Sequence, residues 1–264
     1  MLKLPDAADV SSKWLLVFSV PPRVHFRLIC FPPAGIGAAI FRNWASELPG
    51  DVELCAVQLP GRTIRLGDPA MTSIPQLVEA ITEAIARLPE RKFVFFGHSL
   101  GAVLASEVAR RLTARALPLP SHLIVSGRRP PQFQDPNPPI GDLPDAEFVA
   151  AIDRRYGGIP KEILANPDVL ALLLPGLRAD MVALETFRPG PRPPLPIPIS
   201  AFGGASDPMT PIAHLEAWKL ETVGAFETRA FPGGHFYLDS QRNAVLSEIA
   251  RIIAPILASV QAEI

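Results

Sequence analysis

The sequence predicts an α/β fold with a mostly parallel central sheet flanked by helices. Short apolar runs alternate with segments of helical periodicity along most of the 264 residues, as in strands that are joined by crossover helices. One short apolar run, residues 92–96, leads into Gly97-His98-Ser99-Leu100-Gly101 and then at once into a helical segment. A strand, a sharp turn and a helix in this order form a nucleophile elbow, which presents the serine hydroxyl at the helix N-terminus.

Composition narrows the class of protein. The 25 basic and 26 acidic side chains nearly cancel and no basic run occurs, which argues against a nucleic-acid partner. The apolar run near residues 14–20 is too short to span a membrane, and acidic residues precede it, so we expect no membrane segment and no signal peptide. Cys30 and Cys55 lie in strand-like apolar runs and are expected to be buried, reduced thiols. We expect a cytoplasmic monomer with one domain, residues 1–264.

The first elements of the chain begin the sheet. Strands are expected at residues 14–20 and 24–31, and Pro21-Pro22 between them suggests an opening hairpin. The second strand runs into the loop Phe31-Pro32-Pro33-Ala34-Gly35 and a helical segment whose apolar face includes Phe41 and Trp44. Another strand is expected at residues 52–59.

A helix and a further strand surround the elbow. Ser73-Ile74-Pro75-Gln76 resembles a capping box with proline in the first turn, so a helix should begin there. Pro89 ends this helix. After the elbow helix, which extends to about Ala114, residues 122–126 form another short buried strand.

Residues 128–198, hereafter the insertion, follow a different pattern. Prolines crowd both ends of the insertion, and proline-dense chain is stiff and extended. Helices are expected near residues 145–155 and 167–187, the second interrupted at Pro175-Gly176, and no strand is expected. The second helix carries an apolar stripe of Leu170, Leu173, Leu174, Leu177, Met181 and Leu184. This stripe is either ordinary core or the inner face of a lid over a substrate channel.

The sheet resumes after the insertion. Strands at residues 198–202 and 226–231 each run into a glycine-bearing loop, and a helix that contains Trp218 separates them. A C-terminal helix begins near residue 241. Because strands alternate with helices, both faces of the sheet should be covered.

A serine nucleophile needs a neighbouring base, and the chain has five histidines. His235 alone lies in a glycine-flanked loop just past the C-terminal end of a strand, where ligands of open α/β sheets bind. His98 lies inside the elbow and should point away from the position of the base. His25 and His122 stand at strand starts, at the opposite edge, and His214 falls in a helix. We therefore predict that His235 is the base.

The base in turn needs a carboxylate that holds its tautomer. Asp207, in the loop after the preceding strand, is the best candidate, and Asp239, four residues after His235, is the other. The order Ser99, Asp207, His235 is the order of the α/β-hydrolase triad. The sequence thus predicts an α/β-hydrolase fold.

An oxyanion hole follows from the same topology. One donor is expected to be the amide of Leu100, directly after the nucleophile, and the other the amide of Ala34, in the loop after residue 31. We expect no cofactor and no metal ion.

Motifs between about residues 27 and 240 also carry a resemblance to a known family. They are Phe31-Pro32-Pro33-Ala34-Gly35, Trp44, Leu59-Pro60-Gly61-Arg62, the elbow, Pro118 with Leu123–Gly127, Gly203-Gly204 with Asp207, Trp218, and Gly233-Gly234-His235-Phe236. In these motifs the chain resembles the discrete type II thioesterases of polyketide and non-ribosomal peptide biosynthesis. The resemblance implies an α/β-hydrolase fold with a helical lid insertion, the same triad and the same two oxyanion amides. It also implies hydrolysis of stalled or misprimed acyl groups from the phosphopantetheine arm of an acyl or peptidyl carrier protein.

Two positions depart from the pattern of that family. Ile36 separates Gly35 from Gly37, where paired glycines are usual, and this change could reshape the oxyanion loop or the mouth of the pocket. Thr63 follows Pro60-Gly61-Arg62, where an acidic residue often stands. The role of Arg62 is therefore left open.

The residues leave two other functions open. A triad serves oxygen esters as well as thioesters, so another acyl hydrolase or an acyltransferase on the same fold is the first alternative. Such an enzyme would prefer oxygen esters or acyl-CoA, or would transfer the acyl group to an alcohol or amine. A non-catalytic binding protein of this fold is the second alternative, and a serine-directed fluorophosphonate would not label its Ser99.

Overall fold

The computed structural model describes residues 13–19, 26–133 and 135–262. Within these residues one seven-stranded sheet has the strand order β1-β3-β2-β4-β5-β6-β7. The strands are β1 (Leu15–Ser19), β2 (Phe26–Phe31), β3 (Val52–Val57), β4 (Lys92–His98), β5 (His122–Ser126), β6 (Ile199–Gly204) and β7 (Phe226–Phe231). Neighbouring strands are parallel, except that β1 runs antiparallel to β3. The predicted α/β class with a mostly parallel sheet is confirmed.

The first strand pairs differently from the prediction. β1 forms the edge of the sheet and pairs with β3, with Leu15 opposite Val57, so the expected hairpin between the first two strands is wrong. β2 is paired on both sides, by β3 and by β4, and therefore offers β1 no free edge. Pro21 and Pro22 lie outside the described residues.

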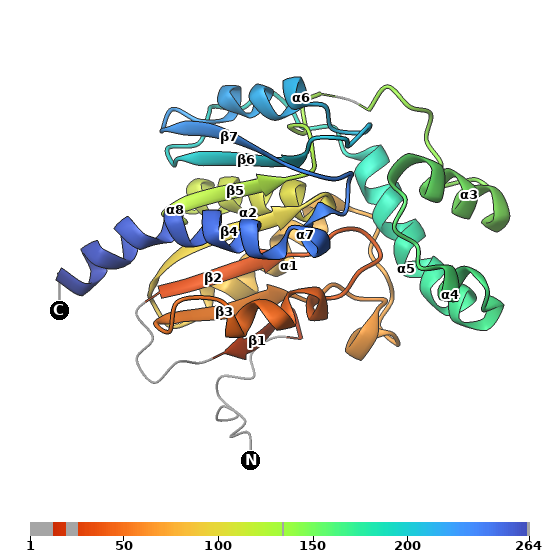
Figure 1. Cartoon of the computed structure of the whole chain (residues 1–264), viewed down its shortest axis with the longest axis horizontal. Coiled ribbons are helices and arrows are strands. Elements are labelled where there is room, and N and C mark those ends of the chain that lie inside the picture. The colour runs from red at the N-terminus through yellow and green to blue at the C-terminus, as the bar shows by residue number, and fades with distance from the viewer. Residues whose placement is uncertain (1–12, 20–25, 134, 263–264) are drawn as a thin grey trace, which may run out of the picture.

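Helices cover both faces of the sheet (Figure 1). α1 (Ile74–Ala86) and α2 (Leu100–Ala114) pack on one face, and α8 (Arg242–Ala262) packs on the other together with the 3-10 helix η1 (Ala38–Ser46). Alternate residues of each strand serve the two faces. Cys55 of β3 accordingly lies in one apolar cluster and Cys30 of β2 in the other. Both described thiols are buried and free, as predicted, and burial raises the pKa of Cys55 to about 12.

Local sequence signals explain two of these helices. The side chain of Ser73 accepts a hydrogen bond from the amide of Gln76 at the start of α1, as the capping pattern predicts. The helical segment expected after the loop at residues 31–37 is a 3-10 helix, which apolar spacing alone does not distinguish from an α-helix. Its three residues per turn place Phe41 and Trp44 on one face, where both rings pack against Phe96.

The insertion lies between β5 and β6 and carries α3 (Asp145–Tyr156), α4 (Lys161–Leu164) and α5 (Pro167–Thr186). These helices stand beside the carboxyl ends of the parallel strands (Figure 1). Over its described residues the insertion contains no strand, only an isolated bridge between Leu195 and Thr222. The short α4 was not predicted.

α5 runs without a break through Pro175, so the predicted interruption is wrong. Proline removes one backbone hydrogen bond, but tertiary packing stabilises the helix on both sides of it. At Gly176 the helix approaches the loop after β3 so closely that a Cβ atom would lie 2.7 Å from the carbonyl oxygen of Gly61. Packing against the body of the protein therefore decides the course of α5.

The C-terminal third completes the sheet. α6 (Ile212–Glu216) and the 3-10 helix η3 (Ala217–Glu221) separate β6 from β7, and the short α7 (Tyr237–Ser240) precedes α8. By length and composition alone α8 could cross a membrane. This is weak evidence, because a core helix passes the same test, and Val245, Ile249 and Ile253 of α8 are buried in the protein core.

Candidate active site

Ser99 occupies the turn between β4 and α2 in a strained conformation. Its φ is 56° and its ψ is −115°, a region that non-glycine residues rarely adopt. A Cβ atom at Gly97 would lie 2.2 Å from the carbonyl oxygen of Gly101, and one at Gly101 would lie 2.0 Å from that of Phe31. Glycine is therefore required on both sides of the serine, and the turn has the geometry of a nucleophile elbow.

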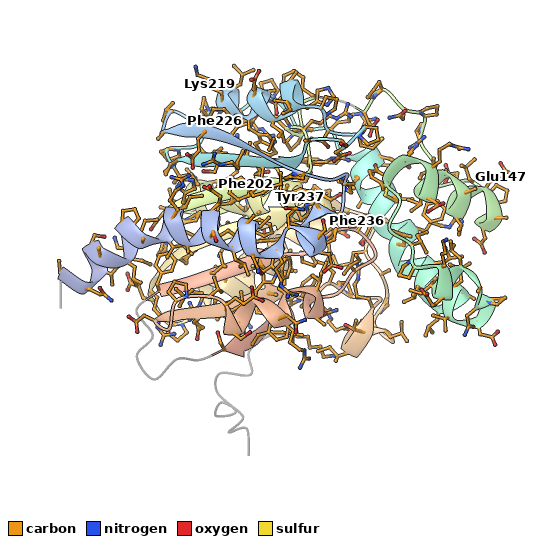
Figure 2. The ribbon with its side chains drawn as sticks, viewed as in Figure 1. Glu147, Phe202, Lys219, Phe226, Phe236 and Tyr237 are labelled. Atoms are coloured by element: carbon orange, nitrogen blue, oxygen red, sulfur yellow. The ribbon has the colours of Figure 1, made fainter. Side chains whose placement is uncertain are left out.

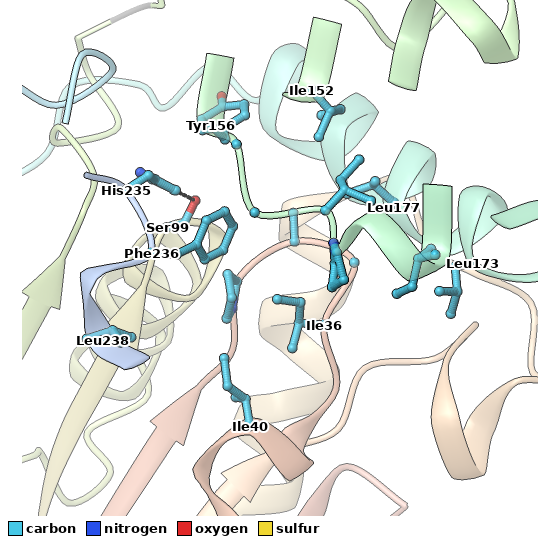
Figure 3. Close-up of a pocket in the computed structure, with 18 of the residues that line it drawn as sticks. Ile36, Ile40, Ser99, Ile152, Tyr156, Leu173, Leu177, His235, Phe236 and Leu238 are labelled. Atoms are coloured by element: carbon cyan, nitrogen blue, oxygen red, sulfur yellow. Dashed lines mark hydrogen bonds between the residues drawn. The ribbon is translucent and has the colours of Figure 1, made fainter. Parts of the chain in front are cut away.

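The side chains of Ser99, His235 and Asp207 form one hydrogen-bonded chain. Ser99 Oγ lies 3.1 Å from His235 Nε2 (Figure 3). His235 Nδ1 lies 2.7 Å from Asp207 Oδ2. The second carboxylate oxygen, Oδ1, accepts the amide of Met209 at 2.9 Å. All three side chains are at least 95 % buried. The structure thus brings together the three residues that the sequence selected.

Backbone contacts hold the histidine and aspartate loops against each other. The amide of Ala205 donates to the carbonyl of Phe231 at 2.7 Å, and the amide of Ser206 donates to that of Gly233 at 2.9 Å. Asp239, the alternative acid, is exposed at the rim of the pocket, while His235 Nδ1 bonds Asp207. The geometry therefore favours Asp207 as the partner of His235.

The remaining histidines lie elsewhere or serve other contacts. His98 Nδ1 lies 2.8 Å from Ser126 Oγ, and burial, with His235 close by, lowers the pKa of His98 well below its ordinary value. His122, at the other edge of the sheet, bonds Ser200. His214 lies partly buried in α6, and His25 lies outside the described residues.

The sequence alone assigns no role to the aromatic residues that surround His235. The rings of Tyr156 and Phe236 have their centres 5.0 Å and 5.2 Å from that of His235. Tyr237 continues the polar chain behind the elbow, because its hydroxyl lies 2.6 Å from Ser126 Oγ. Figure 2 shows Phe236 and Tyr237 toward the insertion, whereas Phe226, at the start of β7, lies far from it. Only the Gly-Gly-His-Phe-Tyr sequence could have signalled this arrangement.

The two predicted oxyanion positions lie at the same edge. Leu100 is the first residue of α2, directly after Ser99. The loop after β2 crosses the elbow at Gly101, and Ala34 of that loop lines the pocket together with Ser99 and His235. Among the described residues neither the Ala34 nor the Leu100 amide is engaged in a loop or side-chain hydrogen bond. Both amides therefore stay candidate donors to a developing oxyanion.

A cavity of about 480 Å³ opens onto Ser99. Most of its lining is apolar and comes from the loop after β2, from the insertion and from the His235 loop (Figure 3). Leu170, Leu173, Leu174, Leu177, Met181 and Leu184, the predicted stripe, all line it. Ile36, which departs from the family pattern, also faces this cavity (Figure 3). The geometry suits an apolar group held next to the serine.

Comparisons with known proteins agree with this geometry. The family model of the thioesterase domain matches residues 26–253. The chain is 38 % identical to thioesterase PikA5 of Streptomyces venezuelae over 91 % of this chain and 85 % of that protein. It is 34 % identical to gramicidin S biosynthesis protein GrsT of Aneurinibacillus migulanus over 94 % and 96 % of the two chains. The solved type II thioesterase BorB of the borrelidin biosynthetic cluster superposes with a TM-score of 0.82 at 33 % identity, covering 90 % and 96 % of the two chains.

These similarities define the class of protein. The chain belongs to the thioesterase family, and within it to the type II thioesterases of polyketide and non-ribosomal peptide pathways. The resemblance inferred from its motifs is confirmed, and with it the α/β-hydrolase fold.

Proposed function

We propose that this protein hydrolyses acyl thioesters on the phosphopantetheine arm of acyl or peptidyl carrier proteins. In a polyketide or non-ribosomal peptide pathway this reaction removes stalled or aberrant chains. The observation that carries the proposal is the Ser99–His235–Asp207 chain, with distances of 3.1 Å and 2.7 Å, at an apolar cavity in a member of the thioesterase family.

The first half of the reaction acylates the enzyme. Ser99 Oγ attacks the thioester carbonyl while His235 Nε2 takes the hydroxyl proton, and Asp207 holds the imidazole in the required tautomer. The amides of Leu100 and Ala34 stabilise the negative charge on the carbonyl oxygen, and each donor is worth about 3 kcal/mol of transition-state stabilisation. The C–S bond then breaks, and His235 returns the proton to the sulfur. A thiol with a pKa near 8.5 leaves more readily than an alcohol.

The second half releases the acid. His235 takes a proton from water, whose oxygen attacks the acyl-enzyme carbonyl. The bond between this carbonyl and Ser99 Oγ then breaks, and the proton passes from His235 to the serine oxygen. The free acid leaves and the hydroxyl of Ser99 is restored.

The insertion is proposed to act as a lid on a single domain that spans residues 1–264. Its stripe on α5 lines the cavity beside Ser99, which supports a role in holding the acyl chain. We further propose a monomer located in the cytoplasm. The two buried, free thiols are consistent with a reducing compartment.

The test compares acyl groups on a carrier protein with the same groups on a short free thiol. We expect a higher kcat/KM for the carrier-bound thioester, because the carrier adds binding contacts. Equal efficiency on both would argue against a docking surface for the carrier. Preferred turnover of oxygen esters, or transfer to an alcohol or amine, would favour the other acyl hydrolases and acyltransferases. If a fluorophosphonate failed to label Ser99, a non-catalytic role would be favoured.

A further inference from the structure

The Pro60-Gly61-Arg62 motif has no part in the reaction described so far. Arg62 is 3 % exposed, and its guanidinium binds both carboxylate oxygens of Asp180 on α5, with Nη2 2.8 Å from Oδ1. Asp180 is 1 % exposed. Arg62 therefore finds its acidic partner in the insertion, 118 positions further along the chain.

The same carboxylate also reaches the oxyanion loop. The amide of Gly35 donates to Asp180 Oδ2 at 2.7 Å. This amide belongs to the peptide group that joins Ala34 to Gly35. Because a peptide group is planar, fixing it restricts the rotation of Ala34 and so limits where the Ala34 amide can point.

Side-chain packing also connects α5 to the oxyanion loop. Gly35 has a φ of +74°, and a Cβ atom there would lie 2.8 Å from a methyl carbon of Leu177, one turn before Asp180. At the other end of the loop, the amide of Ala38 donates to the buried side chain of Gln58 at 3.0 Å. The oxyanion loop is thus held where it meets η1 by Gln58, the residue after β3, and at Gly35 by the insertion.

We propose that Asp180 is a positioning residue of the oxyanion hole. Arg62 orients its carboxylate, the carboxylate holds the Gly35 amide, and the Ala34 amide faces Ser99 only while α5 is seated on the body of the protein. This inference rests on the proposed function, because it assumes that Ala34 is an oxyanion donor. It makes seating of the insertion and completion of the oxyanion hole a single event.

The experiment measures kcat and KM of Asp180→Asn with an acyl thioester of a short free thiol. The shape of the side chain is retained, but the Gly35 and Arg62 contacts are weakened. We expect kcat to fall about 10- to 100-fold, as for a displaced catalytic group, with KM changed less than about 3-fold because the apolar cavity is intact. Affinity for a boronic acid that forms a tetrahedral adduct on Ser99 should fall by the same factor as kcat.

Glu53→Gln is the matched control. Glu53 of β3 forms a similarly buried ion pair with Arg27 of β2, near the starts of these strands and away from the site. This substitution should lower the unfolding free energy, as Asp180→Asn should, yet leave kcat within about 2-fold because the pair touches no loop of the site. Equal effects of the two substitutions on kcat would show that Asp180 acts only through stability and would overturn the proposal.

A double variant covers the case in which Asp180→Asn does not fold. Arg62→Met with Asp180→Leu replaces the ion pair by apolar groups, an exchange that is often neutral or stabilising, but it leaves Gly35 without its acceptor. We expect a stable protein with kcat reduced about 10- to 100-fold. Wild-type kcat in this variant would overturn the proposal. Failure of the proposed function would appear differently, as full turnover by Ser99→Ala.

Discussion

The starts and the ends of the parallel strands carry the same kinds of polar groups, but these groups contact different parts of the molecule. At the edge where strands begin, Arg27 of β2 pairs with Glu53 of β3, and His122 of β5 lies 2.8 Å from Ser200 of β6. These contacts join neighbouring strands directly. Outside the sheet, Arg27 and Glu53 reach only Pro89 and Arg91, in the segment just before β4, and no loop of the site.

The carboxyl edge repeats both kinds of contact with partners from outside the sheet. Arg62 pairs with Asp180 of the insertion, and the bond between His98 and Ser126 extends to Tyr237 at the start of α7. Residue type alone is therefore no guide to function in this fold. Strand direction decides, because the turn that carries Ser99 and the loops that carry Asp207 and His235 all leave the sheet where its parallel strands end.

The largest expected effect contrasts two serines: Ser99, where the parallel strands end, and Ser200, near where they begin. Ser99→Ala should lower kcat about a million-fold, because it removes the nucleophile, and should leave the unfolding free energy nearly unchanged. Ser200→Ala should lose about 1 kcal/mol of stability with its hydrogen bonds and keep wild-type turnover. Thioester hydrolysis and urea unfolding of both variants measure this contrast. Substantial turnover by Ser99→Ala would remove the catalytic role from the elbow.

The next effect compares two carboxylates that lie near a histidine: Asp207, where the strands end, and Glu227, where they begin. Asp207→Asn should lower kcat about 10⁴-fold, because an amide presents the wrong partner to His235 Nδ1 and favours the wrong tautomer. The control is Glu227→Gln, whose carboxylate accepts a hydrogen bond from Ser200 at 2.8 Å near His122. Its kcat should stay within about 2-fold, because it lies at the start of the strands. If Asp207→Asn kept near-normal rates, Asp239 would have to be tested as the acid.

The smallest expected effect is a change in the pH dependence of stability. It concerns His122, whose pKa is lowered by burial to about 4. In the unfolded chain a histidine titrates near 6.5, so below that pH the unfolded state binds more protons and the folded state loses stability until the pH approaches 4. His122→Asn should remove about 3 kcal/mol of this loss between pH 7.5 and 4, while turnover at pH 7.5 is unchanged. Urea unfolding of both proteins across this range measures it. Identical pH slopes would contradict the expectation for His122.

Much of the site could be predicted because its signals are local. The elbow depends on glycines two positions from Ser99, and both glycines meet backbone atoms in the structure as a sharp turn requires. Asp207 and His235 follow strands that end in glycine-bearing loops, and the two side chains lie in hydrogen-bond contact. Their catalytic roles stay predictions. The errors, by contrast, concern pairing and packing at β1 and α5.

The sequence by itself determined the fold class, the elbow and the chain order of the three site residues, because apolar periodicity and turn chemistry act over a few neighbouring positions. Only the tertiary structure decided that β1 pairs with β3, that α5 continues through Pro175, and that Arg62 finds its acid in Asp180. Each of these outcomes depends on contacts between segments far apart in the chain. No local pattern records such contacts, since their energy exists only once the sheet and the insertion have come together.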